Sequence, residues 1–327
     1  MSGFGYNVSG FGSFPSRDSV LSGHMLIVAG GGSGGHKNGG GGGAGGYKAA
    51  GGDGYKLPFL TGVSYTVTIG AGGAGATNSC VSGADTTVAG DFGAGVTNDW
   101  RSRGGGGGAG QDNDINANKG GSGGGGAIKT NGQSQNYAQA ENGSVGGVYY
   151  QSTGNNGVAG VASNFGTNDG YLLMGGGGGA GGHATQGVNT QSDPLGRTCS
   201  AGGVGTQWLN GTKYAGGGEG SIEQRYSTIG VANSGGARDA GGGAGGVAKN
   251  YGSQQINYNP TSGSANTGGG GGGCHFLVAS STRTNGGSGV VIFRYLGATA
   301  ASGGTITSVG GYTFHTFTSS GTFAPNY

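Results

Sequence analysis

The sequence predicts a non-helical, all-β-like fold, in which a polyglycine-II helix bundle or sandwich carries short antiparallel β segments at its N- and C-terminal ends. Glycine accounts for 92 of the 327 residues and is concentrated in separate runs. Fifteen Tyr, 11 Phe and two Trp lie between the runs, and no segment has sustained helical periodicity. Glycine is unfavourable in helices and weakens strand interiors, so the runs must be either disordered or held in a lattice built from the backbone.

The aromatic content favours the lattice, because disordered segments are poor in aromatic and β-branched residues. Ordering glycine costs about 1–2 kcal/mol per residue in backbone entropy, and dense backbone hydrogen bonding must offset much of it. A three-residue-per-turn extended helix has no internal hydrogen bonds, so helices without Cβ atoms can bond laterally on several sides. A sustained Gly-X-Y phase is absent, which excludes collagen. The runs expected to pack in this way are residues 30–32, 39–43, 104–108, 123–126, 175–179, 216–218, 241–243 and 268–273.

The motif Gly-Gly-Gly-Ala-Gly recurs along the chain, with its alanine at Ala44, Ala109, Ala180 and Ala244. This loose repeat predicts a chain that runs back and forth through one bundle, with variable excursions between passes. Chance recurrence in a glycine-rich chain is the alternative.

Short apolar or alternating segments predict strands mostly near the two chain ends. They are residues 25–29, 64–69, 290–295, 305–307, 312–317 and 321–323. We therefore expect an N-terminal attachment arm at 1–23, a glycine-rich polyglycine-II/β domain with loops at 24–297, and a C-terminal β segment at 298–327.

Charge and hydropathy exclude several partners. The net charge is only +2 and the 15 Lys and Arg are scattered, which argues against nucleic-acid binding. No apolar stretch is long enough for membrane insertion, and the N-terminus lacks the pattern of a signal peptide.

Cys80, Cys199 and Cys274 are predicted to be small buried residues, with one disulfide and one thiol as the alternative.

The chain carries no convincing catalytic motif, and we expect no enzyme activity, no cofactor and no metal. Gly-x-Ser-x-Gly occurs at residues 31–35 and 120–124, but a nucleophile elbow needs a following helix, and none is predicted. With this much glycine such matches arise by chance. The five histidines show no metal-ligand spacing, and the acids form no general acid/base pair.

The excursions between the runs are rich in aromatic and amide side chains. Rings stack on the C–H faces of sugars while amides bond hydroxyl groups, so these loops are candidate ligand-binding sites. The alternative is that the aromatic residues cap the glycine bundle. The candidates are Trp100, Asn98, Tyr137, Tyr149, Tyr150, Trp208, Asn210, Tyr226 and Tyr258.

Three pieces of the chain together carry a family resemblance. They are Met25-Leu-Ile-Val-Ala-Gly-Gly-Gly32, Gly286-Gly-Ser-Gly-Val-Val-Ile-Phe-Arg-Tyr295 and the tail from Gly303 to Phe323, which contains Tyr312-Thr-Phe-His-Thr-Phe317. With the glycine runs, residues 24–327 resemble the glycine-rich domain of phage tail-fibre and other virion proteins. The composition is also similar to that of the polyglycine-II tail-fibre adhesins of T-even-like phages.

This resemblance implies a structural virion protein, a phage tail-fibre or host-recognition component. Its partners would be other virion proteins, further copies of itself, and a host surface glycan or outer-membrane protein, and its location would be the virion or the extracellular space. The alternatives are a self-assembling fibre subunit joined by terminal β-strand exchange and, more remotely, an ice-binding protein.

One departure from the family concerns the order of the pieces. The His-Thr-Phe-Thr-Ser-Ser-Gly-Thr-Phe piece commonly precedes Leu-Ile-Val-Ala-Gly-Gly-Gly in that family, whereas here it comes last. We therefore expect the C-terminal strands to lie beside residues 25–29, either within one chain or by donation to a neighbouring subunit.

Overall fold

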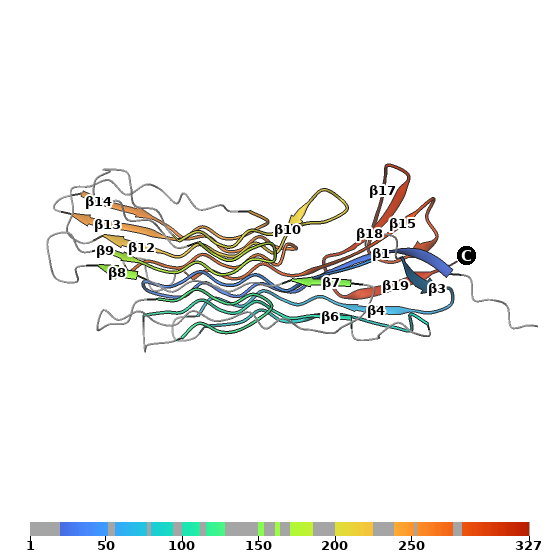
Figure 1. Cartoon of the computed structure of the whole chain (residues 1–327), viewed down its shortest axis with the longest axis horizontal. Helices are drawn as coiled ribbons and strands as arrows, with labels where there is room; N and C mark the ends of the chain where they lie inside the picture. The colour runs from blue at the N-terminus through green and yellow to red at the C-terminus, as the bar shows by residue number, and fades with distance from the viewer. Residues whose placement is uncertain are drawn as a thin grey trace, which may run out of the picture.

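The molecule is all-β and elongated, with strands gathered toward both ends and glycine segments lying side by side between them (Figure 1). A computed structural model describes residues 20–51, 56–76, 80–93, 100–111, 116–127, 150–153, 161–163, 171–185, 200–224, 239–251, 254–276 and 283–326. Within these ranges there is no helix, and hence none that could cross a membrane. The expected non-helical, all-β class is confirmed.

The largest sheet has seven antiparallel strands in the order β17-β18-β15-β1-β2-β7, with β3 also paired to β1. Val20–Gly23 of β1 pairs with β3, and Met25–Val28 pairs with β2. The strands are β1 (Val20–Val28), β2 (Tyr47–Ala50), β3 (Leu57–Leu60), β7 (Tyr150–Thr153), β15 (Val290–Leu296), β17 (Thr305–Val309) and β18 (Tyr312–Phe317).

A five-stranded antiparallel sheet faces it, in the order β16-β19-β4-β5-β6. Aromatic residues from both sheets fill the space between them and form the main hydrophobic core, which includes Phe59, Tyr65, Phe293 and Phe323. The alternating burial of β4 places Tyr65 and Val67 in this core. The strands are β4 (Tyr65–Thr68), β5 (Thr86–Ala89), β6 (Trp100–Ser102), β16 (Ala301–Ser302) and β19 (Gly321–Pro325).

A second five-stranded sheet occupies the opposite end of the molecule, in the order β14-β13-β12-β9-β8 (Figure 1). Its pairs are antiparallel except for β12 and β13, which are parallel. The strands are β8 (Val161–Ser163), β9 (Tyr171–Leu173), β12 (Ile222–Gln224), β13 (Val247–Tyr251) and β14 (Gln254–Tyr258). A hairpin of β10 (Thr206–Gln207) and β11 (Lys213–Tyr214) forms a separate two-stranded sheet.

Backbone hydrogen bonds join the glycine segments in a three-residue repeat. Along residues 40–46 the N–H groups donate in turn to segments 103–109, 175–178 and 268–271, and the order of partners then begins again, with N···O distances of 2.7–2.9 Å. The carbonyl groups between Gly39 and Gly46 accept from three further segments, 29–35, 122–125 and 218–221. One glycine segment is therefore bonded to six others.

Close approach of these segments requires glycine. A Cβ atom at Gly41 would overlap the carbonyl oxygen of Gly218, and one at Gly42 would overlap that of Gly32. The alanines of the recurring motif are all buried, and Ala44 and Ala180 belong to the cluster around Trp208, where side chains meet the glycine segments.

The C-terminal strands pair with strands of both sheets. β18 pairs with β15, which in turn pairs with β1, so β15 separates the C-terminal tail from residues 25–29. β19 pairs with β4 of the other sheet. Direct neighbours of residues 25–29 were expected among the C-terminal strands, but the apolar segment at 290–295 takes that position. Residues 20–23 of the expected arm belong to β1, while the division into three parts stays a prediction.

Candidate binding site

The outer face of the seven-stranded sheet forms the floor of the candidate site. Strand residues alternate between faces, and the register aligns Thr307 of β17, Phe314 of β18, Arg294 of β15 and His24 of β1 in one row. Residues next to them in β15 and β1, such as Phe293 and Met25, belong to the core between the sheets. The row therefore lies on the face away from that core.

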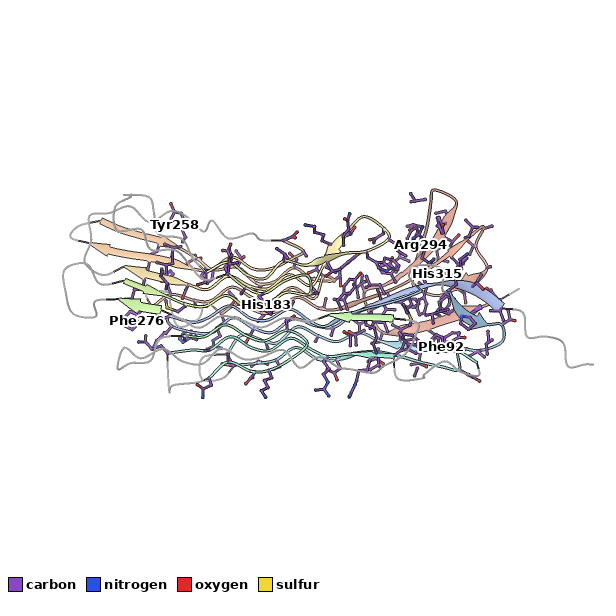
Figure 2. The ribbon with its side chains drawn as sticks, viewed as in Figure 1. Phe92, His183, Tyr258, Phe276, Arg294 and His315 are labelled. Carbon is purple, nitrogen blue, oxygen red and sulfur yellow. The ribbon has the colours of Figure 1, made fainter. Side chains whose placement is uncertain are left out.

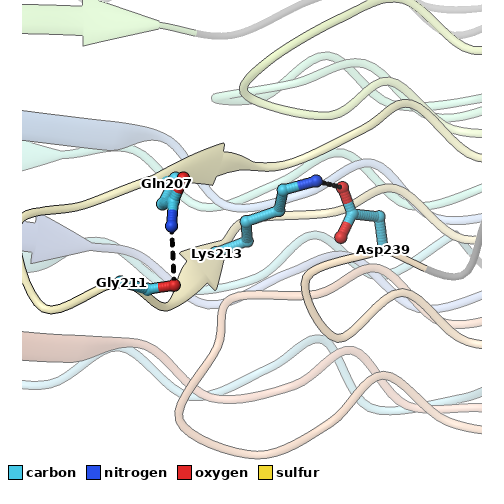
Figure 3. Close-up of polar contacts among 4 residues, drawn as sticks. All are labelled: Gln207, Gly211, Lys213 and Asp239. Atoms are coloured by element: carbon cyan, nitrogen blue, oxygen red, sulfur yellow. Dashed lines mark hydrogen bonds and ion pairs between the residues drawn. The ribbon is translucent and has the colours of Figure 1, made fainter.

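The β10–β11 hairpin forms one wall of the site. Its turn is closed by backbone bonds between Trp208 and Thr212 and from Gly211 N–H to the Trp208 carbonyl. Gly211 has a φ of 80°, which glycine adopts without strain. The Gln207 side-chain amide donates to the Gly211 carbonyl at 2.9 Å (Figure 3). Asn210 accepts from Thr212 N–H at 3.1 Å and donates to the Tyr214 hydroxyl at 2.8 Å. These bonds fix the loop.

Trp208 anchors the hairpin to the sheet. Its side chain is only 5% exposed and meets Phe314 edge to face, with ring centroids 6.5 Å apart. Ala44, Ala180 and Ala215 belong to the same cluster. Lys213 of β11 is ion-paired with Asp239 at 2.8 Å, which ties the hairpin to the neighbouring glycine segment (Figure 3).

A cleft of about 400 Å³ lies between the hairpin and the sheet. Leu209 and Val309 are 49% and 68% exposed, so they present apolar surface to solvent at its rim. Among the described residues, the lining contains one cation and no carboxylate. It consists of Leu209, Asn210, Arg294, Thr307, Val309, Gly310, Tyr312, Phe314 and Thr316.

Arg294 is the charged group of the cleft. Its guanidinium carbon lies 3.7 Å from the ring centroid of Tyr312 and 5.6 Å from that of Phe314. Such stacking fixes the plane of the guanidinium group. Burial lowers the pKa of His24, the cross-strand partner of Arg294, and the positive charges of Arg294 and Lys56 lower it further.

The comparison with protein families identifies the scaffold. A family described as glycine-rich domain matches residues 12–296. The chain belongs to this family. Neither the comparison with curated proteins nor that with solved structures found a match. The glycine-rich domain match includes the hairpin and Arg294 but ends before β17 and β18, which supply most of the remaining lining. The cleft thus joins the family scaffold to the C-terminal strands.

The structure brings together two of the predicted site residues. Asn210 lines the cleft and Trp208 lies beneath it. Trp100 is 2% exposed in the main core, with its ring centroid 5.4 Å from that of Phe92, which fits the packing alternative. Tyr258 is 44% exposed at the opposite end of the glycine-rich domain (Figure 2). Tyr150 begins β7, and Asn98, Tyr137, Tyr149 and Tyr226 lie outside the described residues.

Sequence reasoning missed the sheet residues of the site, above all Arg294. A signal was present: an arginine inside the apolar run 290–295 alternates with Phe293 and Tyr295, so it must face away from their core. The partner strand and the hairpin that meet Arg294 depend on pairing across long sequence distances.

The described cysteines are inert at neutral pH. Burial raises the pKa of Cys80 to about 12 and that of Cys274 to about 11, so both thiols stay protonated. Cys199 lies outside the described residues, and its pairing stays open. Within the described ranges, no three His, Cys, Asp or Glu side chains are grouped as a metal site.

Proposed function

We propose that this glycine-rich domain is a structural virion protein, a phage tail-fibre or host-recognition component that presents the cleft to a receptor. The observation that carries the proposal is the cleft itself. A fixed hairpin and a sheet face combine aromatic, amide, hydroxyl and guanidinium groups at one site. Recognition residues typically stand on loops held by a rigid scaffold. The resemblance to glycine-rich domains of virion proteins supports the same proposal.

The rigid scaffold is proposed to be a polyglycine-II lattice. A helix with three residues per turn directs successive amide groups in three directions, so its hydrogen-bond partners repeat every third residue. The repeat along residues 40–46, with six neighbouring segments, supports this packing.

A host surface glycan is the receptor that the cleft chemistry favours over an outer-membrane protein. The partly exposed ring of Tyr312 offers apolar surface for C–H groups, while Asn210, Thr307 and Thr316 offer partners for hydroxyl groups. Other virion proteins would attach the chain to a particle, and the chain would act there without enzymatic activity.

A panel of bacterial cells and immobilised envelope glycans, probed with the purified chain, tests this proposal. Thr307→Phe places a ring in the cleft, and Ser308→Phe is the matched control on the opposite face of the same exposed strand. We expect Thr307→Phe to abolish adsorption and Ser308→Phe to retain it, with thermal unfolding unchanged in both. If folded wild-type protein bound neither cells nor glycans, the proposed recognition function would be lost.

A self-assembling fibre subunit is the second candidate, favoured by one observation. β17 is an edge strand whose five residues are all exposed, and its sequence Thr-Ile-Thr-Ser-Val lacks charge and proline. Such edges readily accept another strand. Filaments in electron micrographs of the purified chain would support this candidate, and a monomer at all concentrations in light scattering would remove it.

A further inference from the structure

Arg294 is held in place before any ligand arrives. It lies on β15, a central strand of the seven-stranded sheet, with β1 on one side and β18 on the other. Its guanidinium group stacks on Tyr312 and its side chain is half-buried. A stacked arginine loses little further freedom when it binds, and its planar fork matches a carboxylate with two parallel hydrogen bonds.

The positive charge of Arg294 has no carboxylate partner among the described residues. Two ion pairs join Arg101 to Asp85 and Lys213 to Asp239, and no acid is among the described residues that line the cleft. The Nε atom of Arg294 is buried and lacks a hydrogen-bond partner within the same residues. Arg294 as a whole is only half-buried and lines the cleft, so other donors of its guanidinium group remain available to an anion.

The remainder of the cleft suits a sugar rather than a bare anion. The amide of Asn210 uses one N–H and one acceptor position within the hairpin, which leaves one of each for a ligand. Thr307 and Thr316 add hydroxyl groups, and the exposed side chains of Leu209 and Val309 add apolar contact. The volume of about 400 Å³ lies within the range of small-ligand pockets, about 300–1,000 Å³.

We propose that the cleft binds an acidic saccharide through its carboxylate, with the Arg294 guanidinium as the anion anchor and the hairpin and β17 as the sugar-binding walls. This inference rests on the proposed recognition function and gives the class of its ligand. A single stacked arginine in a cleft with apolar walls differs from the extended basic surface that binds nucleic acid.

Titration calorimetry and ligand-observed NMR with defined probes test the anchor. The probes are oligosaccharides ending in glucuronate or sialic acid, their methyl esters, which keep the shape but lose the charge, and sulfated analogues. The variants are Arg294→Gln and Arg294→Lys, and Arg101→Gln is the matched control at an arginine outside the cleft. A thermal unfolding transition verifies that each variant is folded. If Arg294→Gln does not fold, Arg294→Lys is used to test the anchor instead.

We expect the carboxylate probe to bind at least tenfold more tightly than its ester. Arg294→Gln should remove that preference, Arg294→Lys should remove most of it, and Arg101→Gln should preserve it. Equal binding of acid and ester would overturn the acidic ligand but leave glycan recognition standing. Preference for the sulfated analogue alone would overturn the carboxylate. Binding of no saccharide by protein that still adsorbs to cells would overturn the saccharide ligand alone, and binding of neither saccharides nor cells would remove the proposed function as well.

Discussion

The glycine region and the aromatic sandwich are ordered by opposite means. Along residues 40–46 every N–H group is bonded to the backbone of another segment, and methyl groups are nearly absent. In the sandwich, Phe293 stacks on Phe323 with centroids 4.0 Å apart and meets Phe59 and Phe317 edge to face. The first region depends on the absence of side chains and the second on their volume. Adding one Cβ atom in the glycine region should therefore lower the free energy of unfolding more than deleting one ring from the sandwich.

The largest effect is expected from Gly42→Ala. The new Cβ would overlap the carbonyl oxygen of Gly32, and backbone bonded on all sides leaves no room to relax. Overpacking typically costs about 1–3 kcal/mol and occasionally more. Because backbone rather than a side chain must move here, we expect a loss of about 4 kcal/mol or more in the free energy of unfolding, a size that few single substitutions reach. Denaturant-induced unfolding measures it.

Gly321→Ala is the matched control for that substitution. A Cβ at Gly321 would make an ordinary contact of 3.4 Å with the Phe317 ring. We expect a change below about 1 kcal/mol, because alanine also reduces the freedom of the unfolded chain. Equal losses at Gly42 and Gly321 would contradict the lattice argument.

Deleting a ring from the sandwich should have the next largest effect. Phe293→Ala leaves a cavity beside Phe323 and should cost about 3 kcal/mol. Phe293→Leu keeps most of the volume and should cost less than about 1.5 kcal/mol. The same unfolding assay compares both with Gly42→Ala. A larger loss at Phe293→Ala than at Gly42→Ala would reverse the ranking of the two regions.

The sequence predicted which segments form the two regions better than how those segments are arranged. Glycine runs and alternating segments such as Tyr65–Thr68 follow from local composition and period. The position of β15 between β1 and β18 does not, because nothing local in residues 25–29 distinguishes one apolar partner strand from another. The short strands between residues 150 and 258 were also missed. Two of them, β10 and β11, have only two residues each and carry no readable period.

The site was predictable only where a local motif marks it. Trp208 and Asn210 stand in a short aromatic–amide loop and were found. The same pattern also selected Trp100, whose side chain is buried in the sandwich core. Loop composition does not report burial, because burial depends on which sheet closes over the residue.

Lowering the pH should weaken both regions by a moderate amount. Burial lowers the pKa of His275, next to the glycine run 268–273, to about 4, and burial also lowers that of His315 in the sandwich. The His315 Nδ1–H donates to the Gly303 carbonyl at 2.7 Å, which leaves Nε2 of the neutral ring to accept from the Tyr295 hydroxyl at 2.8 Å. Below pH about 6.5 these histidines bind protons in the unfolded chain but stay neutral in the folded chain. The free energy of unfolding therefore falls as the pH falls.

For His275 this loss runs from pH about 6.5 down to its folded pKa of about 4, and it should be on the order of 1–2 kcal/mol between pH 7 and pH 5. Unfolding curves at several pH values measure the slope. His275→Gln should flatten it, and His275→Gln combined with His315→Gln should flatten it further. A slope unchanged in the double variant would show that other groups carry the pH dependence.

The smallest effect is expected at the boundary between the regions, where Lys213 of the hairpin meets Asp239 at 2.8 Å. Their side chains are 51% and 23% exposed, and exposed ion pairs contribute about 0.2–1 kcal/mol because water screens them. A double-mutant cycle with Lys213→Gln and Asp239→Asn should give a coupling near 0.5 kcal/mol that shrinks in high salt. The same cycle at Arg101 and Asp85, 3.7 Å apart and both more than 40% exposed, should give a coupling near zero. A salt-resistant coupling above about 1 kcal/mol at Lys213 would mean that a side-chain pair, rather than Trp208 packing and backbone bonds, holds the hairpin wall of the cleft.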